Sequence, residues 1–162
     1  MKVIILAGGV GQRLWPVSRS ASPKQIKPFI GERTLLQKTV DRLRKGFKKE
    51  DIYFSTGKSH LSTMLRQLPG FSKKHFFLEP DHRGTAAAIG FVAYSIARRN
   101  PHETIVTIPS DHYIREEHLF IKGLRSIERV VHKDPKAVCL LGIHPTYPET
   151  GLGYIETAQP VR

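Results

Sequence analysis

The length and composition of this chain fit one globular domain with a strong positive charge. Its 162 residues are 40% hydrophobic, which is enough for a buried core, and 26 Lys and Arg outnumber 14 Asp and Glu to give a net charge of +12. No apolar run approaches the roughly 18 residues of a membrane span, and the lone Cys139 excludes an internal disulfide. We therefore expect a cytoplasmic protein with no membrane partner.

The chain begins with a predicted strand, and further predicted strands follow along its length. Apolar β-type runs alternate with helical patterns, which is typical of βαβ units and a mostly parallel sheet. The predicted strands are Lys2 to Ala7, Asp51 to Thr56, His75 to Glu79, Thr104 to Pro109, Lys136 to Ile143 and a short one near Tyr154 to Thr157. They predict an α/β fold of three layers and Rossmann-like character, in which ligands bind beyond the carboxyl ends of the strands.

Three helices are predicted between these strands. Apolar residues recur at helical spacing in two segments: Leu36, Val40, Leu43 and Phe47, then Phe120, Leu124, Ile127 and Val131. The Ala-rich segment from Thr85 to Arg99 is apolar almost all round and ends before Pro101, so we expect a deeply packed helix there.

The positive charge leaves nucleic acid, an anionic surface or polyphosphate substrates open as partners. Five basic residues fall on and just beyond the polar side of the first predicted helix: Arg42, Arg44, Lys45, Lys48 and Lys49. They lack an interleaved aromatic platform on which bases could stack. We therefore expect a solvated helix face and no nucleic acid partner.

The first strand runs directly into a Gly-rich, basic loop that contains Gly8, Gly9 and Gly11. Glycines allow backbone N–H groups to approach an anion closely, and Arg13 and Lys24 can neutralise phosphate charge. The loop lacks the Gly-Lys-Ser/Thr end of a Walker loop, and Leu14 stands where a dinucleotide fingerprint has its third Gly. This pattern favours a phosphate cradle.

Two acidic motifs follow later strands, Glu79-Pro80 and Ser110-Asp111. Both should open onto the same sheet edge as the glycine loop. Asp111 is a candidate Mg²⁺ ligand, because a hard carboxylate oxygen suits this ion beside phosphates and water. Asp111 could instead cap the turn or the next helix, and Glu79 could be an ordinary surface acid at a strand end.

The motifs resemble those of one family in content and in order. The glycine loop is similar to the signature L-A-G-G-x-G-x-R-L-x-P of sugar-phosphate nucleotidyltransferases, in which P-K follows some residues later. Trp15, and Gln25 after Pro23-Lys24, resemble the mannose-1-phosphate guanylyltransferase branch. The other segments that resemble this branch are Glu79-Pro80 with Arg83 to Ala86, Pro109 to His112, Gly142 to Thr146, and Pro148 to Ile155.

The resemblance implies transfer of GMP from GTP to mannose 1-phosphate, giving GDP-mannose and pyrophosphate with Mg²⁺. It places Arg13 and Lys24 on the triphosphate and Asp111 on the metal, as the catalytic residues. The nucleotide-binding residues that it implies are Leu6, Ala7, Gly8, Gly9, Gly11, Arg13, Lys24, Glu79, Gly84, Thr85 and Ser110. Gly153 and Tyr154 should approach the sugar, although a turn before a last strand is an equal reading of this segment.

Several positions depart from the family pattern. Gly84 stands where the family usually has Asn, which weakens the case for a base contact there. The other departures are Val10 and Gln12 in place of small hydroxyl residues, Lys27 in place of Leu, and Leu152 in place of Tyr. Backbone contacts to phosphate survive these changes, whereas hydroxyl contacts from positions 10 and 12 do not.

Residues 1–162 resemble only the N-terminal, nucleotide-binding part of a single nucleotidyltransferase domain, so the fold is expected to be truncated. An exposed sheet edge near Val138 to Ile143 and Tyr154 to Thr157 then favours self-association. Two alternatives to the guanylyltransferase reading stay open. One is a non-catalytic guanine-nucleotide-binding module or truncated gene product, and the other is a nucleotidyltransferase for another hexose 1-phosphate.

Overall fold

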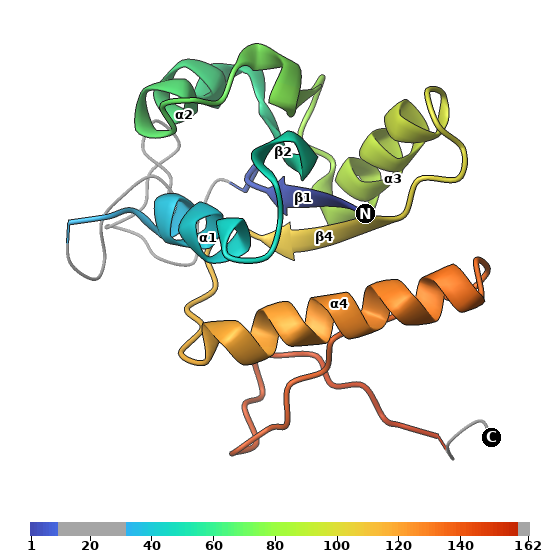
Figure 1. The fold of residues 1–162 in the computed structure, drawn as a ribbon. Helices are drawn as coiled ribbons and strands as arrows, with labels where there is room; N and C mark the ends of the chain where they lie inside the picture. Colours follow the sequence, from blue (N-terminus) through green and yellow to red (C-terminus); the bar gives the residue numbers. More distant parts are fainter. Residues whose placement is uncertain (10–31, 159–162) are drawn as a thin grey trace.

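Four parallel strands form a sheet at the centre of the fold (Figure 1). The computed structural model describes residues 1–9 and 32–158. In chain order the strands and α-helices are β1 (Lys2–Leu6), α1 (Leu35–Arg44), β2 (Ile52–Gly57), α2 (Leu61–Gln67), β3 (Phe76–Glu79), α3 (Gly84–Ala97), β4 (Ile105–Pro109) and α4 (Glu117–Lys133). The sheet order β3-β2-β1-β4 makes β1 an inner strand, and this architecture confirms the predicted mostly parallel α/β fold.

The helices cover the two faces of the sheet unequally. Val3 and Ile5 of β1 belong to one buried cluster with residues of α1, α2 and α4, among them Leu36, Met64 and Leu124. Successive side chains of a strand point to opposite faces, so the fully buried Ile4 points away from this cluster. The helix α3 packs on β3 and buries Ala88 and Val92 outside the cluster. The core therefore sits mainly between the sheet and the face shared by α1, α2 and α4.

The helix α1 has a well-defined start and a buried face. The side chains of Thr34 and Gln37 form a capping box, in which each accepts a hydrogen bond from the other's backbone N–H. Leu36, Val40 and Leu43 are buried as their spacing predicts. Arg42 is buried as well, at 2% exposure, so the prediction that it lies on a solvated face is wrong.

The helix α3 is present where the sequence predicts one, but it is not deeply packed. Only Ala88 and Val92 are buried along its 14 residues, and Tyr94 is 67% exposed. One side of α3 packs on the sheet. Ile89, Phe91 and Ile96 of α3 are half-buried.

The segment after α4 forms neither predicted strand. Residues 137–149 and 153–158 have no regular backbone pairing, and Val138 and Ile143 are 90% and 82% exposed. The segment runs along α4 (Figure 1). Leu141 Cδ1 of this segment lies 3.2 Å from the place that a Cβ on Gly123 would occupy. An extended backbone forms a strand only beside another strand, and β4 pairs only with β1 among the described residues.

A large apolar cavity of about 1270 Å³ lies between β4, α4 and the segment after it. Ile105, Phe120, Ile127 and Leu140 are among its lining residues. None of the helices within residues 1–9 and 32–158 has the length and apolar character needed to cross a membrane.

Candidate active site at the carboxyl edge of the sheet

Hydrogen bonds from the neighbouring strand β2 fix the backbone at the end of β1. The Ala7 N–H donates to the Ser55 carbonyl over 2.8 Å, and Thr56 Oγ1 donates to the Ala7 carbonyl over 3.1 Å. Ala7, Ser55 and Thr56 are all buried. The start of the glycine loop, Gly8 and Gly9, therefore leaves the sheet from a fixed point.

Glu79 lies at the end of β3, and its side chain reaches across β2 toward the start of the glycine loop. Its side chain is buried, and Ser55 Oγ donates a hydrogen bond to Glu79 Oε1 over 2.8 Å. A Cβ on Gly8 would stand 2.9 Å from the same oxygen, closer than real Cβ contacts allow. Glycine at position 8 thus leaves room for the carboxylate in its bond to Ser55, and a Cβ there would require the end of the Glu79 side chain to shift.

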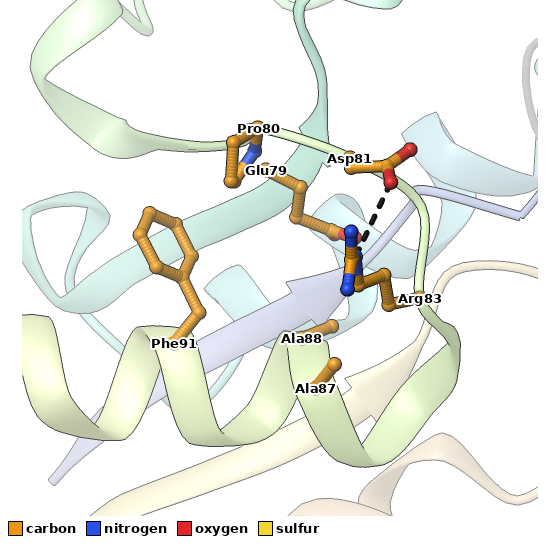
Figure 2. Close-up of a pocket in the computed structure, with 7 residues that line it drawn as sticks. All are labelled: Glu79, Pro80, Asp81, Arg83, Ala87, Ala88 and Phe91. Atoms are coloured by element: carbon orange, nitrogen blue, oxygen red, sulfur yellow. Dashed lines mark hydrogen bonds and ion pairs between the residues drawn. The ribbon is translucent and has the colours of Figure 1, made fainter.

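Glu79 also forms one wall of a small pocket of about 110 Å³ (Figure 2). The other lining residues are Pro80, Asp81, Arg83, Ala87, Ala88 and Phe91. Figure 2 shows the Arg83 guanidinium beside Asp81, with Nε 3.2 Å from Oδ2, at the rim of the pocket. An apolar helix face opposite a buried carboxylate suits a flat ring that carries N–H donors.

Gly84 begins α3 with a φ of +84°, a conformation that favours glycine and that Asn tolerates better than most other residues. Glycine at position 84 therefore adopts this conformation without the steric cost of a Cβ. Thr85 follows in the first turn and is exposed. The side chain of Arg83, at the N-cap position, makes no capping hydrogen bond.

The end of β4 brings Ser110 and Asp111 to the same edge. The Ser110 N–H donates to the Leu6 carbonyl over 3.2 Å, which ties this loop to the end of β1. Ser110 is buried and Asp111 is half-buried. The described residues contain no group of three or more His, Cys, Asp or Glu side chains that could hold a metal by themselves. One carboxylate from the chain is still compatible with Mg²⁺, which binds through one or two carboxylates and completes its shell with water and phosphate oxygens.

The structure thus brings together Leu6, Ala7, Gly8, Glu79, Ser110 and Asp111 at one edge, with Gly84 and Thr85 at the nearby start of α3. Gly11, Arg13 and Lys24 lie outside the described residues. Gly153 and Tyr154 lie in the exposed segment after α4, where the Tyr154 hydroxyl accepts the Glu149 N–H over 2.7 Å and donates to the Glu149 carbonyl. Their sugar-binding role stays a prediction.

Sequence reasoning missed Ser55 and Thr56, which fix Glu79 and Ala7. A signal for them exists, because two adjacent hydroxyl residues interrupt the otherwise apolar run of β2. In a strand that is buried on both faces, hydroxyls need partners, and these partners come from the neighbouring strands.

The parallel sheet, with a glycine loop that begins after β1 and acidic residues at the carboxyl ends of β3 and β4, defines an α/β domain of Rossmann-like layout. The sequence profile of the family described as nucleotidyl transferase matches residues 2–161, and the chain belongs to that family.

Individual relatives agree with the family. The chain is 35% identical over 160 residues to mannose-1-phosphate guanylyltransferase 2 of Escherichia coli O157:H7, which covers 96% of this chain and 33% of that protein. It is 37% identical over 155 residues to the xanthan biosynthesis protein XanB of Xanthomonas campestris pv. campestris, which covers 94% and 32%. The chain therefore spans about a third of the length of these curated relatives.

Solved structures share the fold. One described as mannose-1-phosphate geranyltransferase from Thermus thermophilus superposes with a TM-score of 0.71 at 26% identity, over 82% of this chain and 38% of that one. A mannose-6-phosphate isomerase from Helicobacter pylori superposes with a TM-score of 0.62 at 20% identity, over 82% and 46%. The second match shows the fold alone.

Proposed function

We propose that this chain is the nucleotide-binding part of a mannose-1-phosphate guanylyltransferase, which transfers GMP from GTP to mannose 1-phosphate and releases pyrophosphate. The observation that carries the proposal is the buried Glu79 carboxylate, held by Ser55 against Gly8 at the edge where the glycine loop begins. The names of the relatives from Escherichia coli support the choice of substrates.

Guanine is the base that this carboxylate fits best. Guanine presents the N1–H and the 2-amino group side by side as donors, whereas adenine presents neither in that pattern. Ser55 already donates to Glu79 Oε1, and a carboxylate has about four acceptor positions, so the group keeps the capacity to accept two more hydrogen bonds. The pocket beside it, against Ala88 and Phe91, offers an apolar surface for the ring.

The reaction needs positioning and positive charge more than it needs a base. The attacking phosphate oxygen of the sugar 1-phosphate is already an anion at neutral pH, and the barrier comes from bringing several negative charges together. Arg13 and Lys24 would neutralise the triphosphate, the first as a planar fork and the second as a mobile point charge. Mg²⁺ held through Asp111 would neutralise phosphate charge as a Lewis acid.

Calorimetric titration of the 162-residue chain with GTP, ATP and UTP in the presence of Mg²⁺ tests the proposal. We expect GTP to bind most tightly, and Glu79→Gln to reduce the preference for GTP by about tenfold, as the loss of a charge-assisted hydrogen bond would. Ser55→Ala should reduce the same preference, because Glu79 loses its fixed orientation. The exposed Glu50 and Ser59 offer matched controls as Glu50→Gln and Ser59→Ala.

Equal affinities for the three nucleotides would overturn guanine recognition and leave only a phosphate site. A pyrophosphate release assay with mannose 1-phosphate and other hexose 1-phosphates separates the proposed reaction from its closest alternative. Release with a different hexose 1-phosphate alone would overturn the choice of sugar.

A further inference from the structure

Arg42 is a buried arginine that the proposed reaction does not use. It lies on α1, its side chain is 3% exposed, and its Nη2 donates to the His112 carbonyl over 3.2 Å. On the other side, Nε lies 3.5 Å from Glu117 Oε1 of α4. Arg42 therefore joins α1 both to the loop after β4 and to the start of α4.

Thr39, one turn earlier on α1, contacts the same loop. It is fully buried, and its Oγ1 donates to the Ser110 carbonyl over 3.4 Å. Ser110 and His112 are the residues on either side of Asp111. Two side chains of one rigid helix thus hold the backbone carbonyls that flank the candidate metal ligand.

Burying the Arg42 guanidinium costs free energy, and the ion pair with Glu117 does not explain why an arginine is buried at this position. Nε and Nη1 of Arg42 are buried without a hydrogen bond, and burial lowers the pKa of Arg42 from its ordinary value, against the influence of Glu117. An apolar side chain of similar length would pack between α1 and α4 at a smaller cost. What such a side chain could not supply is the hydrogen bond to the His112 carbonyl.

We infer that Thr39 and Arg42 are positioning residues, which hold the Ser110–His112 backbone so that Asp111 can bind a divalent cation together with the nucleotide phosphates. This inference rests on the proposed function. It predicts that substitutions at Thr39 and Arg42 reduce the gain in nucleotide affinity that the divalent cation provides and leave the affinity without the cation nearly unchanged.

The test compares GTP affinity in Mg²⁺ and in EDTA for the 162-residue chain, measured by calorimetry. Asp111→Asn should abolish the gain in affinity that Mg²⁺ gives. Thr39→Val and Arg42→Met should each reduce that gain by about fivefold, the effect of losing one hydrogen bond, and should change the affinity in EDTA by less than about twofold. The matched control is Arg44→Met, an exposed arginine on the same helix, which should leave both affinities unchanged.

Hydrogen exchange supplies a readout that does not depend on the nucleotide. Thr39→Val, a nearly isosteric change, should speed exchange at the amides of Asp111 and His112 and leave β1 and β2 unaffected. Thr39→Val also decides the test if Arg42→Met fails to fold.

Two results separate the failure of this inference from the failure of the proposed function. If Asp111→Asn removes the Mg²⁺ gain while Thr39→Val and Arg42→Met keep it, or weaken GTP equally in Mg²⁺ and EDTA, then only the positioning role is overturned. If Asp111→Asn keeps the full Mg²⁺ gain, the metal assignment in the proposed function is wrong, and the inference fails with it.

Discussion

The carboxyl edge of the sheet and the segment after α4 differ in how their residues are held. At the edge, buried hydroxyls and backbone groups of adjacent strands fix Ala7, Glu79 and Ser110. After α4, apolar side chains such as Val138 and Ile143 are exposed, and none of the strands within residues 1–9 and 32–158 pairs with the backbone. Apolar, β-prone residues alone do not make a strand, because the ladder of hydrogen bonds needs a second strand.

The largest contrast should appear when one apolar side chain is truncated in each region. Ile5→Ala empties a fully buried position in β1 and should lower the free energy of unfolding by about 2–5 kcal/mol, from lost burial and the cavity that remains. Ile143→Ala, at 82% exposure, should change it by less than about 0.5 kcal/mol. Urea denaturation of both variants measures the difference. Similar losses would show that the segment after α4 is packed in solution.

The sequence predicted the sheet well because its signals are local to each strand. Apolar runs marked β1, β2, β3 and β4 to within a residue or two, and the spacing of Leu36, Val40 and Leu43 marked α1. The short helix α2 was not predicted.

The predictions that were wrong concern features that depend on partners distant in the sequence. The predicted strand from Lys136 to Ile143 lacks a neighbour in the described residues. The burial of Arg42 requires α4 and the loop after β4 to close over α1. Glu79 and Asp111 were recognised as strand-end acids. The hydroxyls of β2 signal that Ser55 needs a partner, but that this partner is Glu79, and that Thr39 contacts the loop after β4, follows only from contacts between elements.

The second prediction concerns the two glycines that follow β1. Gly8→Ala places a Cβ against the Glu79 carboxylate and should cost about 1–3 kcal/mol of stability, as overpacking does, with weaker GTP binding. Gly9→Ala is the matched control, since a Cβ there meets nothing within 4 Å. Thermal unfolding and calorimetry on both variants measure the contrast. Equal behaviour of the two would mean that Glu79 moves away from Gly8 freely.

The third prediction concerns pH and the contact between α1 and α4. The Lys45 ammonium, 2.5 Å from Glu117 Oε2, holds the pKa of Glu117 below its ordinary value of 4.5, and Arg42 acts in the same direction. A carboxylate with a lowered folded-state pKa stabilises the fold above its unfolded pKa, and this stability is lost as pH falls through the folded pKa. Glu117→Gln should therefore lose less stability than the parent between neutral pH and about pH 3.

Urea denaturation at several pH values measures this effect, with the exposed neighbour Glu116 as a control in the form Glu116→Gln. If Glu117→Gln and the parent lose the same stability on acidification, the ion pair with Lys45 does not contribute to the stability of the fold.

The smallest effect expected is a weak association of the chain with a second copy. The outer edge of β4 is unpaired among the described residues, and exposed apolar side chains lie nearby on the segment after α4. Unpaired, apolar edges favour pairing between copies, although a net charge of +12 opposes it. Light scattering should therefore show a dimer that increases with protein and salt concentration. A monomer at every concentration and at high salt would contradict this.

The order of the strands in the sheet has a consequence for the kinetics of folding. Phe54 pairs with Phe76 and Val3 with Ile52, whereas Lys2 pairs with Ile105, so that β4 joins the sheet by closing the longest loop of the three. Contacts that close long loops cost more chain entropy and slow folding. Ser110 and Asp111 follow β4, so this part of the candidate site at the carboxyl edge of the sheet assembles only with the slowest pairing. Nucleotide binding during refolding should then appear with the last kinetic phase.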